Sequence, residues 1–350
     1  MKKLLFVIFI LLFSLVACSD DETTTEPEPE EEPVEEVEEE LEEPEKPSTP
    51  EHIYPLTGME AEEKVTDRMI AVMVNNHPKA RPQTGLSQAD TVFEILAEGN
   101  ITRLMAIFQS DIPERVGPVR SARPYYFNLA DDYNAIYVYH GAANFIEDMI
   151  QNGAAQGLNG MYYDNDKVLF ERSSDRVAPH NSYALFDGIY QRAEEQEYPL
   201  EAEYQPLTFI EEDQASEGET ATDVQFSYSN YSVRYVYDQE KKSYERYSDG
   251  VQTVEKTDST PIMLENVLIM ETPHQVIDDA GRREIDLESG GNALLLQQGK
   301  VQHVQWERID GRIIPTKDGE PVPFVSGQTW VNVIPTSPGI DGVQLSSETE

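Results

Sequence analysis

Met69-Ile70-Ala71-Val72-Met73-Val74 is a short apolar run, and the polar turn Asn75-Asn76-His77-Pro78-Lys79-Ala80-Arg81-Pro82 follows it directly. An uninterrupted run of this length predicts a buried strand, which the proline-rich turn ends. In α/β folds, sites gather beyond the carboxyl ends of strands. We therefore expect functional side chains in the turn after this strand.

After this strand the pattern predicts strands interleaved with helices. Further strands are expected at 91–97, 103–109 and 135–140. Helices are expected at 121–133, where Ser121 can cap a helix with Pro124 in its first turn, at 143–151, and from Asn181 or Ser182 to about 197. This alternation predicts an N-terminal α/β domain with a mixed sheet over residues 52–205.

Beyond a polar, acidic stretch at 206–222 the pattern changes. Short segments rich in Val, Ile and Tyr follow one another, separated by Gly, Asp or Asn, and they predict a mostly-β domain over residues 222–345. The predicted strands are 224–228, 232–237, 243–247, 266–271, 293–297, 301–306 and 329–334. The fold class expected is thus α+β, with two domains. Trp306 and Trp330 suit either a strand core or a carbohydrate-stacking face.

The N-terminus has the parts of an export signal. Lys2 and Lys3 precede an apolar run from Leu4 to Val16, and Leu15-Val16-Ala17-Cys18 resembles the end of a bacterial lipoprotein signal. The resemblance implies a signal peptide at 1–17 and a diacylglyceryl anchor on Cys18, at the extracytoplasmic face of the cell membrane. The alternative is an ordinary signal peptide with a chance cysteine. Cys18 is the only cysteine, so lipidation leaves no thiol for catalysis, a disulfide or a zinc site.

The segment after the anchor is strongly acidic. Residues 20–46 contain 16 acids and one base, and the whole chain carries a net charge of −40. Such a composition predicts a disordered tether over residues 18–50, either as a plain spacer or as a recognition tail for a basic partner. Residues 47–350 still carry −27, which argues against direct binding of nucleic acid.

One segment departs from this acidity. Residues 77–123 have a net charge of +1 and end in Gly117-Pro118-Val119-Arg120-Ser121-Ala122-Arg123. Two guanidiniums beside a helix start suit a carboxylate or a phosphate. Alternatively, Arg120 and Arg123 pair with Glu94 and Glu98, two carboxylates that strand alternation would place on the same side.

Three histidines, His77, His140 and His180, follow predicted strands or lie in loops. If they meet at one edge of the sheet, a proton-transfer role becomes conceivable, although a loop histidine is more often a surface residue. Their spacing matches no metal motif, so no metal or other cofactor is expected.

A set of motifs runs through both predicted domains and carries a family resemblance. They are 69–76 with the following HPKARPQTGL (77–86), Ala89-Asp90, Glu98-Gly99, Thr102-Arg103, Gly117–Arg123, Pro179–Tyr183, Gly299-Lys300, Trp306 and Gly327–Val331. On these motifs the chain resembles the YerB-like family of bacterial lipoproteins over nearly all of residues 54–335. The resemblance implies a domain of unknown function with a distinct C-terminal domain. It also implies a partnership with the DNA helicase PcrA, as described for the family's namesake.

Three functions follow from these observations. The first is a binding or scaffolding lipoprotein that holds an anionic envelope ligand or a protein partner. The second is an envelope hydrolase or transferase with a histidine acid or base, and the third is the helicase partnership. Because no nucleophile lies beside a base in the sequence, binding is favoured over catalysis. The candidate ligand-binding residues are Asn76, His77, Arg81, Glu98, Arg103, Arg120, Ser121, Arg123, His140, His180 and Asn181.

Overall fold

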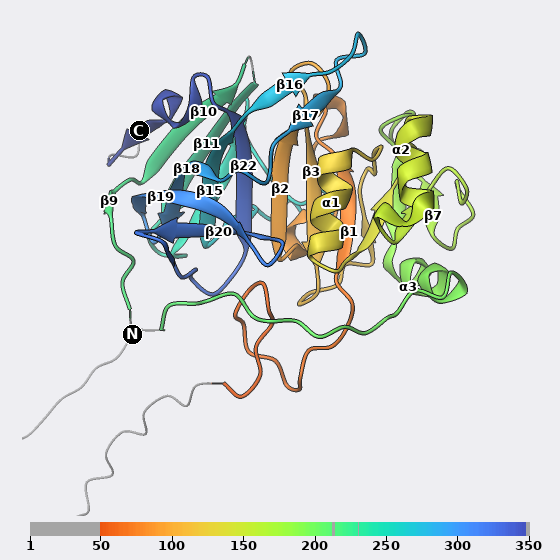
Figure 1. Cartoon of the computed structure of the whole chain (residues 1–350), viewed down its shortest axis with the longest axis horizontal. Helices are drawn as coiled ribbons and strands as arrows, with labels where there is room; N and C mark the ends of the chain where they lie inside the picture. Colours follow the sequence, from red (N-terminus) through yellow and green to blue (C-terminus); the bar gives the residue numbers. More distant parts are fainter. Residues whose placement is uncertain (1–49, 212–213, 230, 348–350) are drawn as a thin grey trace, which may run out of the picture. The chain divides into compact units, whose positions relative to one another are not determined.

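Strands dominate the part of the chain that the structure describes, which is residues 50–347 apart from 212, 213 and 230 in a computed structural model (Figure 1). The predictions for the signal peptide, Cys18 and the tether up to residue 49 lie outside these residues. Within the described residues, no helix is long and apolar enough to span a membrane.

The strand expected at 69–74 is present as β1 (Ile70–Asn75), and all six of its residues are buried. It pairs antiparallel with β3 (Thr102–Phe108) and parallel with β5 (Ile136–Tyr139). β6 (Gly157–Asn159) continues the parallel pairing beyond β5. The prediction of a mixed sheet in the N-terminal region is therefore confirmed.

This sheet continues into the C-terminal region of the chain. β22 (Thr329–Pro335) lies between β2 (Thr91–Leu96) and β15 (Asn266–Thr272), and it is parallel to both. The described residues form a twelve-stranded sheet in the order β21 (Glu320–Pro321), β20 (Arg312–Lys317), β19 (Lys300–Ile309), β18 (Gly291–Gln297), β15, β22, β2, β3, β1, β5 and β6, with β9 (Glu219–Thr220) beside β19. One sheet thus crosses the sequence positions at which we expected two domains to meet.

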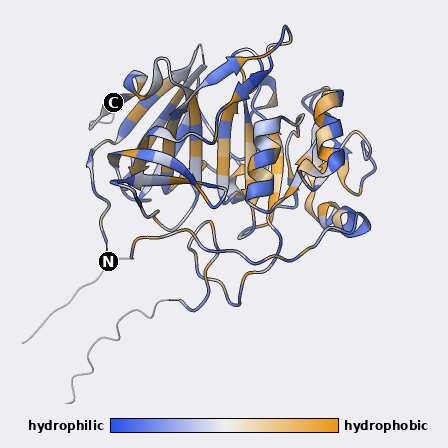
Figure 2. Ribbon diagram, in the orientation of Figure 1, coloured by the Kyte–Doolittle hydropathy of each residue, from blue (hydrophilic) through white to orange (hydrophobic). Residues whose placement is uncertain are grey.

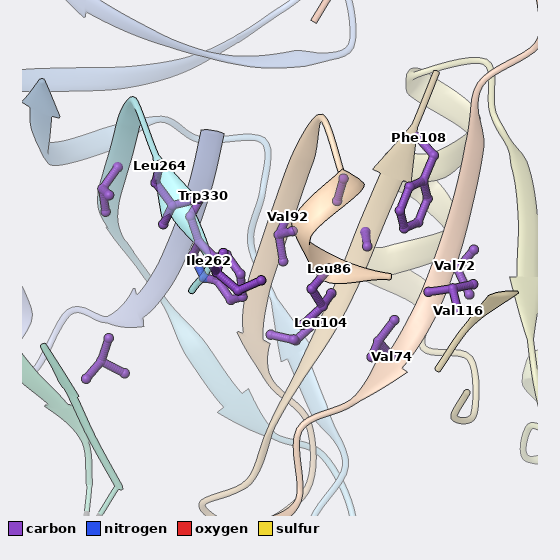
Figure 3. Close-up of a cluster of buried hydrophobic side chains, with 14 of the residues drawn as sticks. Val72, Val74, Leu86, Val92, Leu104, Phe108, Val116, Ile262, Leu264 and Trp330 are labelled. Carbon is purple, nitrogen blue, oxygen red and sulfur yellow. The ribbon is translucent and has the colours of Figure 1, made fainter. Parts of the chain in front are cut away.

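A second, six-stranded sheet comes entirely from the C-terminal region. Its order is β13 (Val251–Gln252), β12 (Ser243–Ser248), β11 (Tyr231–Asp238), β10 (Asp223–Tyr228) and β23 (Gln344–Ser346), with β14 (Met263–Leu264) beside β12. Its apolar side chains share one core with residues of the long sheet from both regions. Figure 3 shows part of this core, in which Val92 of β2 and Leu104 of β3 lie between Trp330 of β22 and Val74 of β1. The two sheets pack face to face around this core. Figure 2 shows the hydrophobic colour along strands of both sheets.

The helices are short and cover both faces of the N-terminal strands. α1 (Pro124–Asp132) and α2 (Asn144–Met149) pack on one face, while α3 (Phe186–Glu195) contributes its apolar side to the core on the other face. α2 runs on as a π-helical turn over Ile150–Ala154. The C-terminal region is mostly strand, as expected.

Two helix predictions need correction. The helix expected from Asn181 or Ser182 begins only at Phe186, because Ser182–Leu185 forms strand β8, which pairs with β4 (Arg115–Val116) and β7 (Phe170–Arg172). α1 begins at Pro124 after an extended Arg123, so Ser121 lies in the preceding loop and does not cap it. In both places tertiary strand contacts override a local capping signal.

The aromatic side chains of the C-terminal region belong to the core. Trp306 and Trp330 are both 0 % exposed, which excludes the carbohydrate-stacking alternative for these two residues.

The remaining two-stranded sheet is a hairpin of β16 (His274–Val276) and β17 (Arg283–Ile285). It leans over β2 and α1 in Figure 1 and lines, with α1, a hollow of about 440 Å³.

Candidate functional site

The carboxyl ends of the parallel strands β1, β5 and β6 meet at one edge of the sheet, and the loop of residues 117–122 crosses them. The backbone N–H of Arg120 donates to the carbonyl of Met73 at 2.9 Å, and the N–H of His140 donates to the carbonyl of Arg120 at 2.9 Å. Arg120 is therefore fixed between the ends of β1 and β5. This is the edge at which α/β folds usually bind ligands.

Gly117 allows the loop to make this crossing. Its φ is +152°, and a Cβ atom at this position would lie 3.0 Å from the carbonyl oxygen of Ser182 and from the ring of Tyr183. A larger residue would therefore be strained and crowded at the same time. The sharp turn at Gly117-Pro118 therefore requires glycine at its first position.

The side chain of Arg120 is the most unusual group at this edge. Among the described residues, it is the one arginine whose guanidinium has no hydrogen-bond or ion-pair partner; every other arginine contacts a carboxylate or a backbone carbonyl. Burial, with a smaller effect of Arg103, lowers the pKa of Arg120 to about 10. The group is still charged at neutral pH, so a partly buried positive charge lacks an internal counterion.

Two stacked imidazoles lie within electrostatic reach of Arg120. The ring centroids of His77 and His180 are 4.7 Å apart, at an interplanar angle of 28°. The Nδ1 of His77 accepts from the N–H of Lys79 at 3.1 Å, and the Nδ1 of His180 accepts from Nδ2 of Asn75 at 2.9 Å. When neutral, both rings must therefore carry their hydrogen on Nε2. Each Nε2–H is left as a donor without a partner among the described residues.

The surroundings of the two histidines are positively charged. Burial lowers the pKa of His77, with further lowering from Lys79, Arg81 and Arg120. Burial likewise lowers the pKa of His180, and His77, Arg120, Lys79 and Arg176 add to the effect. Both imidazoles are consequently neutral at pH 7, and an anion placed here would meet only donors and cations.

Ser121 adds a further donor beside Arg120. Its hydroxyl makes no hydrogen bond to any described residue, and its carbonyl accepts from Nη1 of Arg103 at 2.8 Å. Arg120, Ser121, His77 and His180 together form what we call the Arg120 site. Its free donors come from three separate loops, at residues 77, 120–121 and 180.

Three other predicted residues form a closed ion cluster. Glu98 accepts from Nη2 of Arg103 at 2.7 Å and also pairs with Arg123. The structural alternative is thus right for Arg123 and wrong for Arg120. It is also wrong for Glu94, whose carboxylate lies on the opposite face of the sheet in contact with Arg246, because β2 ends at Leu96 and its alternation does not reach Glu98.

Asn76 and Arg81 lie behind the Arg120 site and connect it to the core. The Nδ2 of Asn76 donates to Glu94 Oε1 at 3.0 Å, while its Oδ1 accepts from Nε of Arg81 at 3.1 Å. The Arg81 guanidinium lies 4.6 Å from the centre of the Tyr231 ring and pairs with Asp249. These two residues hold the turn after β1 in place and offer few free donors.

The side chains of His140 and Asn181 belong to a separate network. The Nε2 of His140 lies 3.3 Å from Asp164 Oδ1, and Arg172 joins Asp164 to Asn181 through hydrogen bonds of 3.0 and 2.9 Å. The structure therefore brings His77 and His180 together beside Arg120 but directs the His140 ring elsewhere. Within the described residues, no group of three His, Cys, Asp or Glu side chains is placed to hold a metal ion.

Sequence reasoning missed two residues of this region. Asn75 is buried and bonds both histidines, since its Oδ1 accepts from the N–H of His77 at 3.0 Å. Arg176 donates to the carbonyls of Ala80 and Pro82 at 2.6 Å each. The Asn75-Asn76 pair at a strand end was the available signal for the first. For Arg176, which lies in a loop almost 100 residues further along the chain, there was none.

Comparisons with known proteins place this chain among proteins of unknown function. Residues 56–199 match the model described as "Protein of unknown function (DUF3048) N-terminal domain", and residues 222–331 match the model of its C-terminal domain. The chain is 46% identical over 286 residues to "Putative lipoprotein YerB" of Bacillus subtilis (strain 168), covering 80% of this chain and 86% of that protein.

A solved structure agrees with the sequence comparison. The crystal structure of the YerB protein from Bacillus subtilis superposes with a TM-score of 0.77 at 44% identity, covering 84% of this chain and 99% of that one. The resemblance that the motifs indicated is therefore confirmed. The chain, which is similar to YerB over most of its length, belongs to the DUF3048 family.

Proposed function

We propose that this protein is a membrane-anchored lipoprotein that binds an anionic ligand at the Arg120 site. The name of its Bacillus subtilis relative and the signal ending in Cys18 support the anchor. The observation that carries the binding function is the partly buried guanidinium of Arg120, which has no internal partner beside two imidazoles with free Nε2–H groups. A sulfate or phosphate placed there would accept from several donors at once and supply the missing counterion.

The same geometry favours binding over catalysis. A hydrolase or transferase with a histidine base needs that base beside a nucleophile or an activated water. The Nδ1 atoms of His77 and His180 are already occupied by N–H donors. In their neutral form these rings therefore donate hydrogen bonds and do not accept a proton from substrate. The extracytoplasmic location and the helicase partnership both stay predictions.

Replacing Arg120 with alanine tests this function. We expect affinity for inorganic phosphate to fall about tenfold to a hundredfold, because hydrogen bonds to charged groups contribute about 1.5–3 kcal/mol each. Isothermal titration of the purified chain measures the loss. Arg120→Lys should retain part of the affinity, and Arg312→Ala, which removes an arginine of β20, should retain all of it.

The free energy of unfolding separates this role from a structural one. Because Arg120 has no partner to lose among the described residues, Arg120→Ala should leave the urea midpoint unchanged or raise it. Phosphate affinity equal to that of the original chain, with a clear loss of stability, would show that Arg120 is structural and that no anion site exists here.

The pH dependence of sulfate binding provides a second prediction. The pKa values of His77 and His180 are lowered in the free protein. A bound dianion favours their protonated forms, in which Nδ1 carries a hydrogen and gives up the hydrogen bond that it accepts from Lys79 or Asn75. Sulfate keeps its charge between pH 5 and 7, so its affinity should rise as the pH falls across this range. In a chain carrying both His77→Gln and His180→Gln the rise should disappear; an equal rise in that variant would place the titrating groups elsewhere.

A further inference from the structure

More cations surround the Arg120 site than a single small anion can contact. Lys79 lies in the same turn as His77, and its ammonium has no partner among the described residues. Arg176 contacts neutral carbonyls, so its guanidinium charge is not neutralised by those contacts. Both cations, together with Arg120, lower the pKa of His180 through their charge.

The balance of charges on this side of the site is positive. Lys79, Arg81, Arg120, Arg176 and Lys256 carry five positive charges. Asp249 pairs with Arg81, and Asp175 pairs with Lys256 and lies near Arg176, so Lys79, Arg120 and Arg176 are the three of these cations without an ion pair among the described residues. This excess lies on a chain with a net charge of −40. A single phosphate at Arg120 neutralises only part of it.

These cations lie in loops that contact one another. The rings of His77 and His180 are stacked, and the charges of Lys79 and Arg120 act on both rings, while that of Arg176 acts on His180. The rings come from two different loops, 77–80 and 173–180, which Arg176 fastens together through the carbonyls of Ala80 and Pro82. Lys79 and Arg176 therefore lie in two loops that are in contact, and Arg120 comes from a third loop.

We propose that the natural ligand is a linear chain with repeated phosphate groups, one held at Arg120 and the next held by Lys79 and Arg176. This inference rests on the proposed function, because it specifies the ligand of the same site. Phosphate suits the donor set better than carboxylate does. The guanidinium of Arg120 and the Nε2–H groups of His77 and His180 come from three separate loops. A tetrahedral anion can accept from several directions, whereas a planar carboxylate accepts near one plane.

A chain-length series tests the proposal on the purified full chain. Inorganic phosphate, pyrophosphate and tripolyphosphate are titrated at constant ionic strength and constant pH, in a buffer without magnesium. Tripolyphosphate should bind at least about tenfold more tightly than phosphate, because the second anionic group gains its own charge-assisted contacts. Equal affinity for all three would overturn the proposal and leave the Arg120 site as a site for one anion.

The variant Lys79→Ala locates the second group. Since an exposed ion pair contributes up to about 1 kcal/mol, we expect tripolyphosphate affinity to fall about two- to fivefold, with phosphate affinity unchanged. Lys79→Arg should restore the loss, and Lys64→Ala, which removes an exposed lysine paired with Glu203, should have no effect. An equal effect of Lys79→Ala on both ligands, or no effect on either, contradicts a second phosphate position.

Two further results separate this inference from the function on which it rests. If no phosphate compound binds, the proposed anion site itself fails. If phosphate binds through Arg120 but polyglutamate of matched charge binds as tightly as tripolyphosphate, the anion site stands and the assignment to phosphate chains is wrong.

Discussion

Replacing Arg246 with leucine should destabilise the fold by about 3–5 kcal/mol, because this change leaves a buried carboxylate without its counterion. Arg246 Nη2 lies 2.7 Å from Glu94 Oε2, and the two side chains are 1 % and 0 % exposed. The urea midpoint and the dependence of the unfolding free energy on urea measure the loss. Lys64→Leu, which breaks an exposed pair with Glu203, should leave the midpoint unchanged within error.

The double variant Glu94→Gln with Arg246→Leu shows whether the loss comes from the orphaned charge. With no carboxylate left to bury, the destabilisation should be clearly smaller than in Arg246→Leu alone. Glu94 also accepts from Asn76, Thr102 and Trp330, and a glutamine can keep only part of these contacts. A double variant as unstable as the single one would show that packing around Arg246, and not the unpaired carboxylate, is the cause.

This ion pair also shows why part of the fold could not be predicted. Strands with an apolar pattern of their own were predictable, so 69–74, 91–97 and six of the seven predicted C-terminal strands were found within two residues, whereas strands such as β20 were not predicted. Which strands pair is a property of distant segments. Arg246 and Glu94 are 152 residues apart, and nothing local in either strand indicates the contact.

For the candidate site, too, the local segments were predictable and the contacts between distant residues were not. The turn after β1 and the GPVRSAR loop could be singled out, since strand ends and glycine-proline loops are local signals. Whether a given arginine is paired depends on tertiary contacts. Sequence spacing offered Glu94 and Glu98 as partners for Arg120 and Arg123, whereas in the structure Glu98 pairs with Arg103 and Arg123, and Arg120 has no described partner.

The twelve-stranded sheet joins the two regions that the sequence predicts as separate domains. β2 belongs to residues 52–205, yet β22 of the C-terminal region pairs with it from Thr91↔Thr329 to Ile95↔Val333. A fragment of residues 50–205 would expose this strand edge together with its apolar faces. It would also leave Glu94 without Arg246. Neither cost is offset within the fragment.

We therefore expect residues 50–205, produced alone, to show no cooperative unfolding transition. Residues 50–347 should unfold cooperatively, since the structure places them in a single compact unit. Co-production of 50–205 with 206–347 should restore the transition and the protection of β2 amides against hydrogen exchange, because β22 can then pair with β2. A sharp transition of the 50–205 fragment by itself, with protected β2 amides, would mean that the N-terminal region is an independent domain. The pairing of β2 with β22 would then be a contact between two domains that fold independently.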